Sequence, residues 1–146
     1  MTTDVKLRRY KFDLAALQRL AAMNYAALRP LVESVRQSGS LVIKVGHQLR
    51  FALTVLEAAP YTTEVRIEQQ ALVQQLPGLK ETQLDVRLYH DAQLAEVIRS
   101  QGVARLQASY DVPNPKMHHA DEKHQVNYFL QEWIQLIRER GHLQEI

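Results

Sequence analysis

The residues of this chain that are best suited to metal binding or catalysis are a set of histidines and aspartates. The set consists of His90, Asp91, His118, His119, Asp121 and His124. Imidazole and carboxylate groups are common ligands of zinc, manganese and iron. If the segment before the last predicted helix folds over the strand that ends near His90, these side chains form a site of three or four ligands. Such a site would suit a metal-assisted hydrolase.

The same residues also have ordinary structural roles, and the sequence favours these. Asp121 can cap the N-terminus of a helix, and Asp91 can hold a turn after a strand. The spacing matches no established metal signature such as His-Glu-x-x-His. We therefore expect a structural polar network, with metal binding and metal-free acid–base catalysis as alternatives. The residues do not identify a cofactor.

A second candidate surface is charged rather than rich in histidine. Alternate positions of two predicted strands carry charges of opposite sign, at Glu64, Arg66, Glu68, Asp85 and Arg87. Arg50 is a further candidate for this face. If helices cover the opposite face of the sheet, this one is open to a protein or small-molecule partner. The ordinary alternative, which the pattern favours, is cross-strand ion pairing in water, worth roughly 0.2–1 kcal/mol per pair.

The elements that carry these residues follow from hydrophobic periodicity. A period of two predicts strands over residues 41–45, 49–55, 61–70, 84–89 and 104–110. The first two are joined by a Gly46-His47 hairpin turn, because glycine adopts the positive φ that tight turns need. The pattern over residues 94–99 is too short to distinguish a strand from a short helix. An antiparallel meander of about five strands is expected.

Two helices complete the predicted fold. The first begins at the N-cap candidate Asp13, ends at Gly39 and is expected to kink or break near Pro30, since proline removes an internal hydrogen bond. The second runs from Asp121 to Gly141, where glycine suits the left-handed position that closes helices. With both helices on one face, the fold class is α+β. Residues 1–12 are expected to form a flexible arm and residues 13–146 a single domain.

Composition limits the possible functions. The 146 residues include 46% hydrophobic and 23% charged residues, which is typical of one globular domain. With no cysteine and no apolar signal or membrane-spanning run, a cytoplasmic protein is expected. The formal net charge of +2 is too small to favour nucleic-acid binding. The phosphate-binding glycine loops of nucleotide sites are also absent.

Several phrases resemble a bacterial family of small proteins with a domain of unknown function, the YqiB-like family. The phrases are Tyr61-Thr62-Thr63, Ile67-Glu68-Gln69, residues 86–92, Ala95-Glu96-Val97, Tyr110-Asp111, Pro113-Asn114, Lys116-Met117-His118 and residues 121–125, followed by Asn127, Phe129, Leu130 and Trp133. The similarity covers most of the chain from the first helix onward. It implies a cytoplasmic protein of a proteobacterium and implies no particular activity.

These observations favour a non-catalytic binding or regulatory module that engages a protein or small-molecule partner. A metal-assisted hydrolase that uses the histidine and aspartate set is the alternative. Weak binding of nucleic acid is the second alternative. No membrane partner is expected, and an exposed edge strand is compatible with a homodimer.

Overall fold

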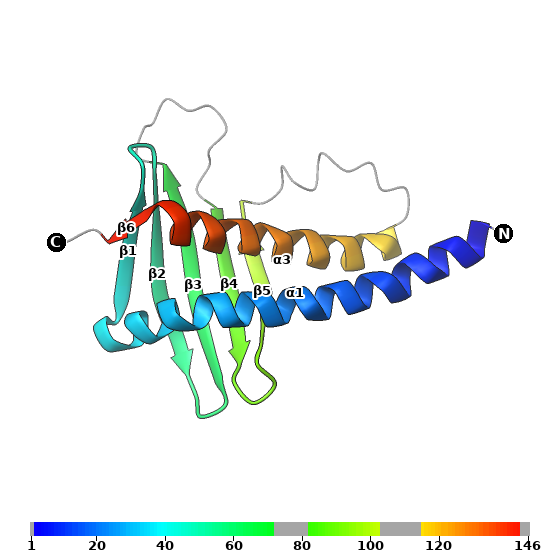
Figure 1. Cartoon of the computed structure of the whole chain (residues 1–146), viewed down its shortest axis with the longest axis horizontal. Helices are drawn as coiled ribbons and strands as arrows, with labels where there is room; N and C mark the ends of the chain where they lie inside the picture. The colour runs from blue at the N-terminus through cyan, green and yellow to red at the C-terminus, as the bar shows by residue number, and fades with distance from the viewer. Residues whose placement is uncertain (1, 72–81, 103–114, 144–146) are drawn as a thin grey trace.

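The computed structural model describes residues 2–71, 82–102 and 115–143, and describes side chains over residues 14–70, 82–102 and 123–143. Its elements follow one another along the chain (Figure 1): α1 (Thr2–Ser38), β1 (Ser40–Val45), β2 (Leu49–Ala58), β3 (Thr62–Ala71), β4 (Thr82–Tyr89), β5 (Leu94–Gln101), α3 (Pro115–Arg140) and β6 (Gly141–Leu143). None of the described helices is both long and apolar enough to cross a membrane.

The described strands form one antiparallel sheet in the order β5-β4-β3-β2-β1-β6. Strands β1 to β5 make a meander, and β6 returns from the end of the chain to pair with the outer side of β1. Because side chains alternate between the faces of a strand, the register places apolar residues opposite each other, as in Leu53 with Ile67 and Val65 with Val86. One face of the sheet is therefore apolar.

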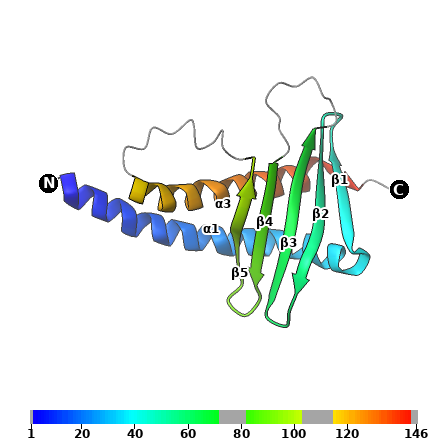
Figure 2. The same ribbon diagram turned by 180° about the vertical axis from the view of Figure 1, so that it is seen from behind.

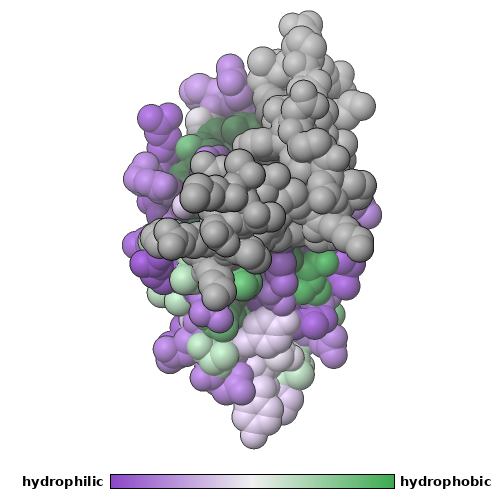
Figure 3. All heavy atoms as spheres, turned by 90° about the vertical axis from the view of Figure 1, so that its right-hand side faces the viewer, coloured by the Kyte–Doolittle hydropathy of each residue, from purple (hydrophilic) through white to green (hydrophobic). Residues whose placement is uncertain are grey.

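Both helices cover that apolar face. Figures 1 and 2 show α1 and α3 running across the strands on the same side, which leaves the other side of the described sheet without a helix. Phe51 of β2 and Trp133 of α3 are buried against each other with ring centroids 5.2 Å apart. Burial of such a large apolar side chain stabilises the fold by roughly 1.5–3 kcal/mol. In Figure 3, hydrophobic atoms are visible among hydrophilic ones on the described part of this side of the molecule.

Two buried asparagines fix the helices on the sheet. The Asn127 Oδ1 atom accepts a hydrogen bond from the Val97 backbone N–H at 3.1 Å. The Asn24 side chain of α1 donates to the Asn127 carbonyl oxygen at 3.0 Å. Asn24 is 1% exposed and Asn127 is fully buried, so loss of either partner would leave polar atoms unsatisfied. These bonds specify how α1, α3 and β5 pack together.

The structure confirms the first helix but not its predicted start or break. It begins at Thr2 rather than at Asp13 and continues through Pro30. Leu28 and Val32, on either side of Pro30, are buried in the core, and this packing outweighs the hydrogen bond that proline cannot donate. The end is as predicted, since Gly39 has φ +85° and donates its N–H to the Val35 carbonyl oxygen at 2.6 Å. The division into arm and domain stays a prediction.

The last helix also begins earlier than predicted, at Pro115 instead of Asp121. Proline suits the first helical position because its missing N–H would have no helical partner there. The helix ends before Gly141, but Gly141 is not among the described glycines with positive φ. Its role is steric, because a Cβ atom at this position would clash with the Ile137 carbonyl oxygen and lie 2.7 Å from Ile43 Cγ2.

The predicted α+β class is confirmed, with two helices on one face and an antiparallel sheet. The number of strands differs, because six are described where about five were expected. Residues 94–101 form a strand, which resolves the ambiguity left by the sequence, and the three-residue strand β6 was not predicted. The strand predicted over residues 104–110 lies outside the described residues.

Candidate functional site

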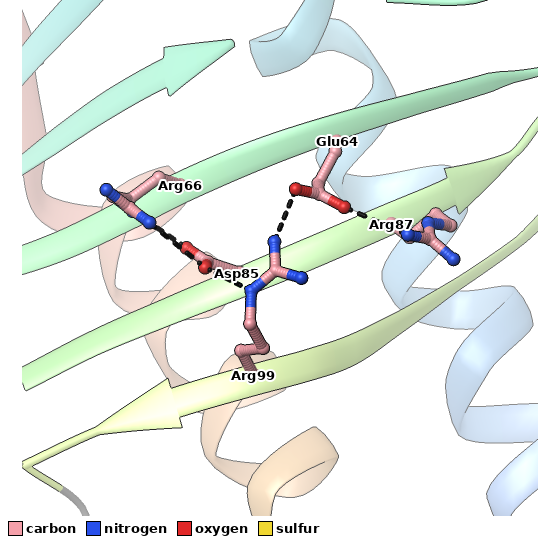
Figure 4. Close-up of polar contacts among 5 residues, drawn as sticks. All are labelled: Glu64, Arg66, Asp85, Arg87 and Arg99. Atoms are coloured by element: carbon pink, nitrogen blue, oxygen red, sulfur yellow. Dashed lines mark hydrogen bonds and ion pairs between the residues drawn. The ribbon is translucent and has the colours of Figure 1, made fainter. Parts of the chain in front are cut away.

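Five charged side chains lie together on the uncovered side of the sheet. We name this group the charged face; it comprises Glu64, Arg66, Asp85, Arg87 and Arg99 (Figure 4). The strands place them there because Arg66 lies opposite Asp85 across β3 and β4, and Glu64 lies opposite Arg87. Their apolar neighbours in sequence point into the core.

Asp85 receives two arginines. Its Oδ1 and Oδ2 atoms accept hydrogen bonds from Arg66 Nε at 2.9 Å and Arg66 Nη2 at 3.2 Å. Oδ2 also accepts from Arg99 Nε at 3.0 Å. The two-point contact with Arg66 fixes the plane of the guanidinium group, which a single contact would not do.

Glu64 joins the remaining arginines. Its two carboxylate oxygens accept hydrogen bonds from Arg87 Nη2 at 3.0 Å and from Arg99 Nη2 at 2.5 Å. Arg99 therefore bridges Glu64 and Asp85, as Figure 4 shows. The five side chains form one connected network across β3, β4 and β5.

The network is asymmetric in its exposure to solvent. The side chains of Asp85 and Glu64 are 1% and 10% exposed, whereas those of Arg66, Arg87 and Arg99 are 35%, 39% and 55% exposed. The carboxylates thus lie beneath the guanidinium groups. Each guanidinium carries five N–H donors, and the bonds within the network use some of them. The uncommitted donors are available to acceptor groups of a ligand.

The same geometry determines the ionisation of Asp85. Burial opposes ionisation of this carboxyl, but the hydrogen bonds from Arg66 and Arg99, together with their positive charges, hold its pKa below the ordinary value. The hydrogen bonds and charge of Asp85 raise the pKa values of Arg66 and Arg99 in turn. Hydrogen bonds with Tyr89 and Glu64 raise the pKa of Arg87. Asp85 and the three arginines are therefore ionised at neutral pH.

The structure brings together four of the five residues predicted for this face. Glu68 lies on the same side of β3, but its carboxylate accepts from Gln70 Nε2 at 3.4 Å and forms none of the ion pairs of the network. Arg50 donates to Gln70 Oε1 at 2.6 Å and likewise stays outside it. Arg99, which the network requires, was missed.

Arg99 was missed because the pattern over residues 94–99 was too short to assign a strand, and because a β-bulge interrupts the alternation there. Val86 pairs with Val97 and Asp85 pairs with Arg99, so Ile98 is an extra residue in β5. The bulge places Arg99 opposite Asp85, a position that simple alternation from Glu96 would give to Ile98. One sequence signal could have indicated Arg99. It is an arginine near the end of a short segment that directly follows two strands of alternating charge.

His90 of the predicted metal set lies in a different environment. Its Nδ1 atom is 2.9 Å from the Tyr25 hydroxyl and its Nε2 atom is 2.8 Å from Thr63 Oγ1. Both hydroxyl groups can donate or accept, so a neutral imidazole can satisfy both contacts. The ring connects α1, β3 and the turn after β4. A metal ion at His90 would have to displace one of these hydroxyl groups.

The other members of the set are only partly described. Asp91 is exposed in the turn between β4 and β5, and the His124 ring packs on Tyr128 with centroids 4.7 Å apart. The side chains of His118, His119 and Asp121 lie outside the described residues. Over the described part of the chain, no three His, Asp or Glu side chains form a group that could hold a metal ion. The metal site stays a prediction.

Comparison with known proteins identifies relatives of the chain. Residues 27–143 match the model of a family described as "Protein of unknown function (DUF1249)". The chain is also 40% identical over 135 residues to proteins named "Uncharacterized protein YqiB" from Escherichia coli K12 and from Escherichia coli O157:H7, covering 92% of this chain and 95% of each relative. No solved structure gives a significant match. The family resemblance predicted from the sequence is thereby confirmed, and the chain belongs to the DUF1249 family.

Proposed function

We propose that this protein is a non-catalytic, cytoplasmic binding module that engages an acidic segment of a partner protein through the charged face. One observation carries the proposal: three arginines stand partly exposed over two carboxylates that are buried beneath them. The carboxylates orient the guanidinium groups, and the outward side of the cluster consists of donors. Such a surface is complementary to carboxylate and carbonyl oxygens.

Preorganisation supports binding in this arrangement. A free arginine loses side-chain entropy when it is fixed at an interface, at a cost of roughly 0.5–1.5 kcal/mol for each immobilised side chain. Arg66 and Arg99 are already held by Asp85, so part of this cost is met during folding. Arginine is also among the residues enriched at the centres of protein interfaces.

The test is a titration of the full chain with a fluorescent oligoglutamate peptide. The double variant Arg66→Gln/Arg87→Gln removes two outward cations, and we expect it to weaken binding by about tenfold or more. Glutamine is chosen because it retains side-chain hydrogen bonding near Asp85 and Glu64. Circular dichroism establishes that the variant is folded.

The matched control is Arg19→Gln/Arg36→Gln, which removes the same charge from exposed positions of α1. The proposal requires this control to bind like the wild type at low and at physiological salt. If both double variants weakened peptide binding equally, the affinity would depend only on the net charge of the protein. The charged face would then have no specific role.

A further inference from the structure

The opposite end of the same sheet face carries basic residues that form no ion pair with a carboxylate of the described residues. His142 of β6 lies opposite Lys44 of β1, and Lys44 lies opposite Arg50 of β2. Directly opposed residues of antiparallel strands present their side chains on one face, with Cβ atoms about 4.5–5.5 Å apart. With Arg140 and His47 nearby, we name these five residues the basic corner.

The charges of the basic corner are not neutralised within the described part of the chain. Arg50 donates to the uncharged Gln70, and neither Lys44 nor Arg140 forms an ion pair with a described carboxylate. Like charges placed directly opposite each other destabilise a sheet. Lys44 and Arg50 therefore repel each other in the free protein, and a bound anion would relieve this repulsion.

The basic corner also encloses a concave surface. A pocket of about 590 Å³ is lined by Lys44, Gly46, His47, Glu139, Arg140 and His142. Glu139 is the single carboxylate of this lining, and it accepts a hydrogen bond from Gln135 at 3.3 Å. Volumes of about 300–1,000 Å³ are typical of sites for small ligands.

A close backbone contact builds this pocket. Gly141 joins α3 directly to β6, and any Cβ at this position would clash with the Ile137 carbonyl oxygen and press on Ile43. Glycine therefore allows the chain to turn from the helix into a strand beside β1. As a consequence, Arg140 and His142 lie over the β1–β2 turn rather than extending away from the sheet.

We infer that the basic corner is a binding site for the phosphate groups of a phosphate-bearing ligand. Lysine and arginine are the side chains that bind phosphate oxygens most strongly, through charge-assisted hydrogen bonds. Lys44 and Arg140 line a concave surface whose lining contains one carboxylate, and Arg50 lies opposite Lys44 on the neighbouring strand. This inference does not depend on the proposed function, because it concerns other residues at the other end of the sheet.

The test is isothermal titration of the full chain with inorganic tripolyphosphate and, separately, with a short single-stranded oligonucleotide. We expect tripolyphosphate to bind, and we expect Lys44→Gln/Arg140→Gln to weaken its binding by about tenfold or more. Tighter binding of the oligonucleotide, lost in the same variant, would identify a nucleic-acid backbone as the source of the phosphates.

A matched control distinguishes a specific site from general attraction. Arg19→Gln/Arg36→Gln removes the same charge from exposed positions of α1, and it is expected to bind tripolyphosphate like the wild type. Absence of binding by the wild type would overturn the inference. Equal weakening by both double variants would also overturn it, because phosphate would then respond to net charge alone.

Discussion

The two ends of the uncovered sheet face use the same residue types in opposite ways. Across β3, β4 and β5, each arginine of the charged face meets a carboxylate, as Arg66 and Arg99 do at Asp85. Across β6, β1 and β2, the register instead brings together His142, Lys44 and Arg50. Among the described residues, the first end pairs its own charges and the second does not.

This difference separates two reasons for charge on a sheet. A complementary row contributes to stability and holds its side chains in fixed positions. Like charges on opposed strand positions lower the free energy of unfolding. A bound molecule of opposite charge removes this penalty. The ion pairs hold the side chains of the charged face in fixed positions, as the proposed docking surface requires, whereas the inferred phosphate site relies on the unpaired charges of the basic corner.

Loss of Asp85 is expected to have the largest effect on stability. Asp85→Ala removes the buried carboxylate shared by Arg66 and Arg99. Breaking a fully buried pair costs about 3–5 kcal/mol. We expect a smaller loss of about 2 kcal/mol in the free energy of unfolding, because water can reach the partly exposed arginines. Urea denaturation followed by circular dichroism measures it.

The control is Asp91→Ala, six residues further along and exposed in the β4–β5 turn. A surface substitution of this kind is expected to change the free energy of unfolding by no more than about 0.5 kcal/mol. If the two alanine variants were equally stable, the charged face would contribute no more than an ordinary set of surface charges.

Lowering the pH is expected to reduce the free energy of unfolding by a smaller amount, through protonation of the Asp85 carboxyl. Because the arginines lower the pKa of Asp85 in the folded chain, the unfolded chain binds the proton more tightly. The stabilisation is therefore complete above the ordinary aspartate pKa of about 3.9 and is lost as the pH falls further, through the folded pKa. Asp85→Asn should flatten this part of the stability curve, which urea denaturation at a series of pH values measures. An unchanged acid slope in the variant would assign the effect to other carboxyls.

Reversal of a charge in the basic corner is expected to have the smallest effect, and one of opposite sign. Lys44→Glu replaces repulsion from Arg50 with attraction, and it should raise the free energy of unfolding by about 0.5 kcal/mol. The same variant should lose tripolyphosphate binding. A decrease in stability would show that Lys44 already has a favourable role in the free protein.

Local sequence patterns predicted much of this fold. Alternation of apolar and charged residues placed Glu64 and Arg66 on one side of β3 and Asp85 and Arg87 on the same side of β4. Hydrophobic periodicity of three and four predicted both helices. These features depend on neighbours in the chain, so the sequence carries them directly.

The remaining features depend on contacts between distant residues. The bulge at Ile98 interrupts the alternation of β5, which hid Arg99 from the pattern. Strand β6 has three residues, too few to show a period, and exists because Gly141 allows close packing beside Ile43. The contact of His90 with Tyr25 spans 65 positions in the sequence. No local pattern reports such a contact.

The most direct test of the account is a pair of double-mutant cycles on the free energy of unfolding. One cycle combines Arg66→Ala with Asp85→Ala, and the other combines Lys44→Ala with Arg50→Ala; each gives the coupling energy between its two side chains. We predict a favourable coupling for Arg66 with Asp85 and an unfavourable coupling for Lys44 with Arg50. Couplings of the same sign at both ends of the sheet would contradict it.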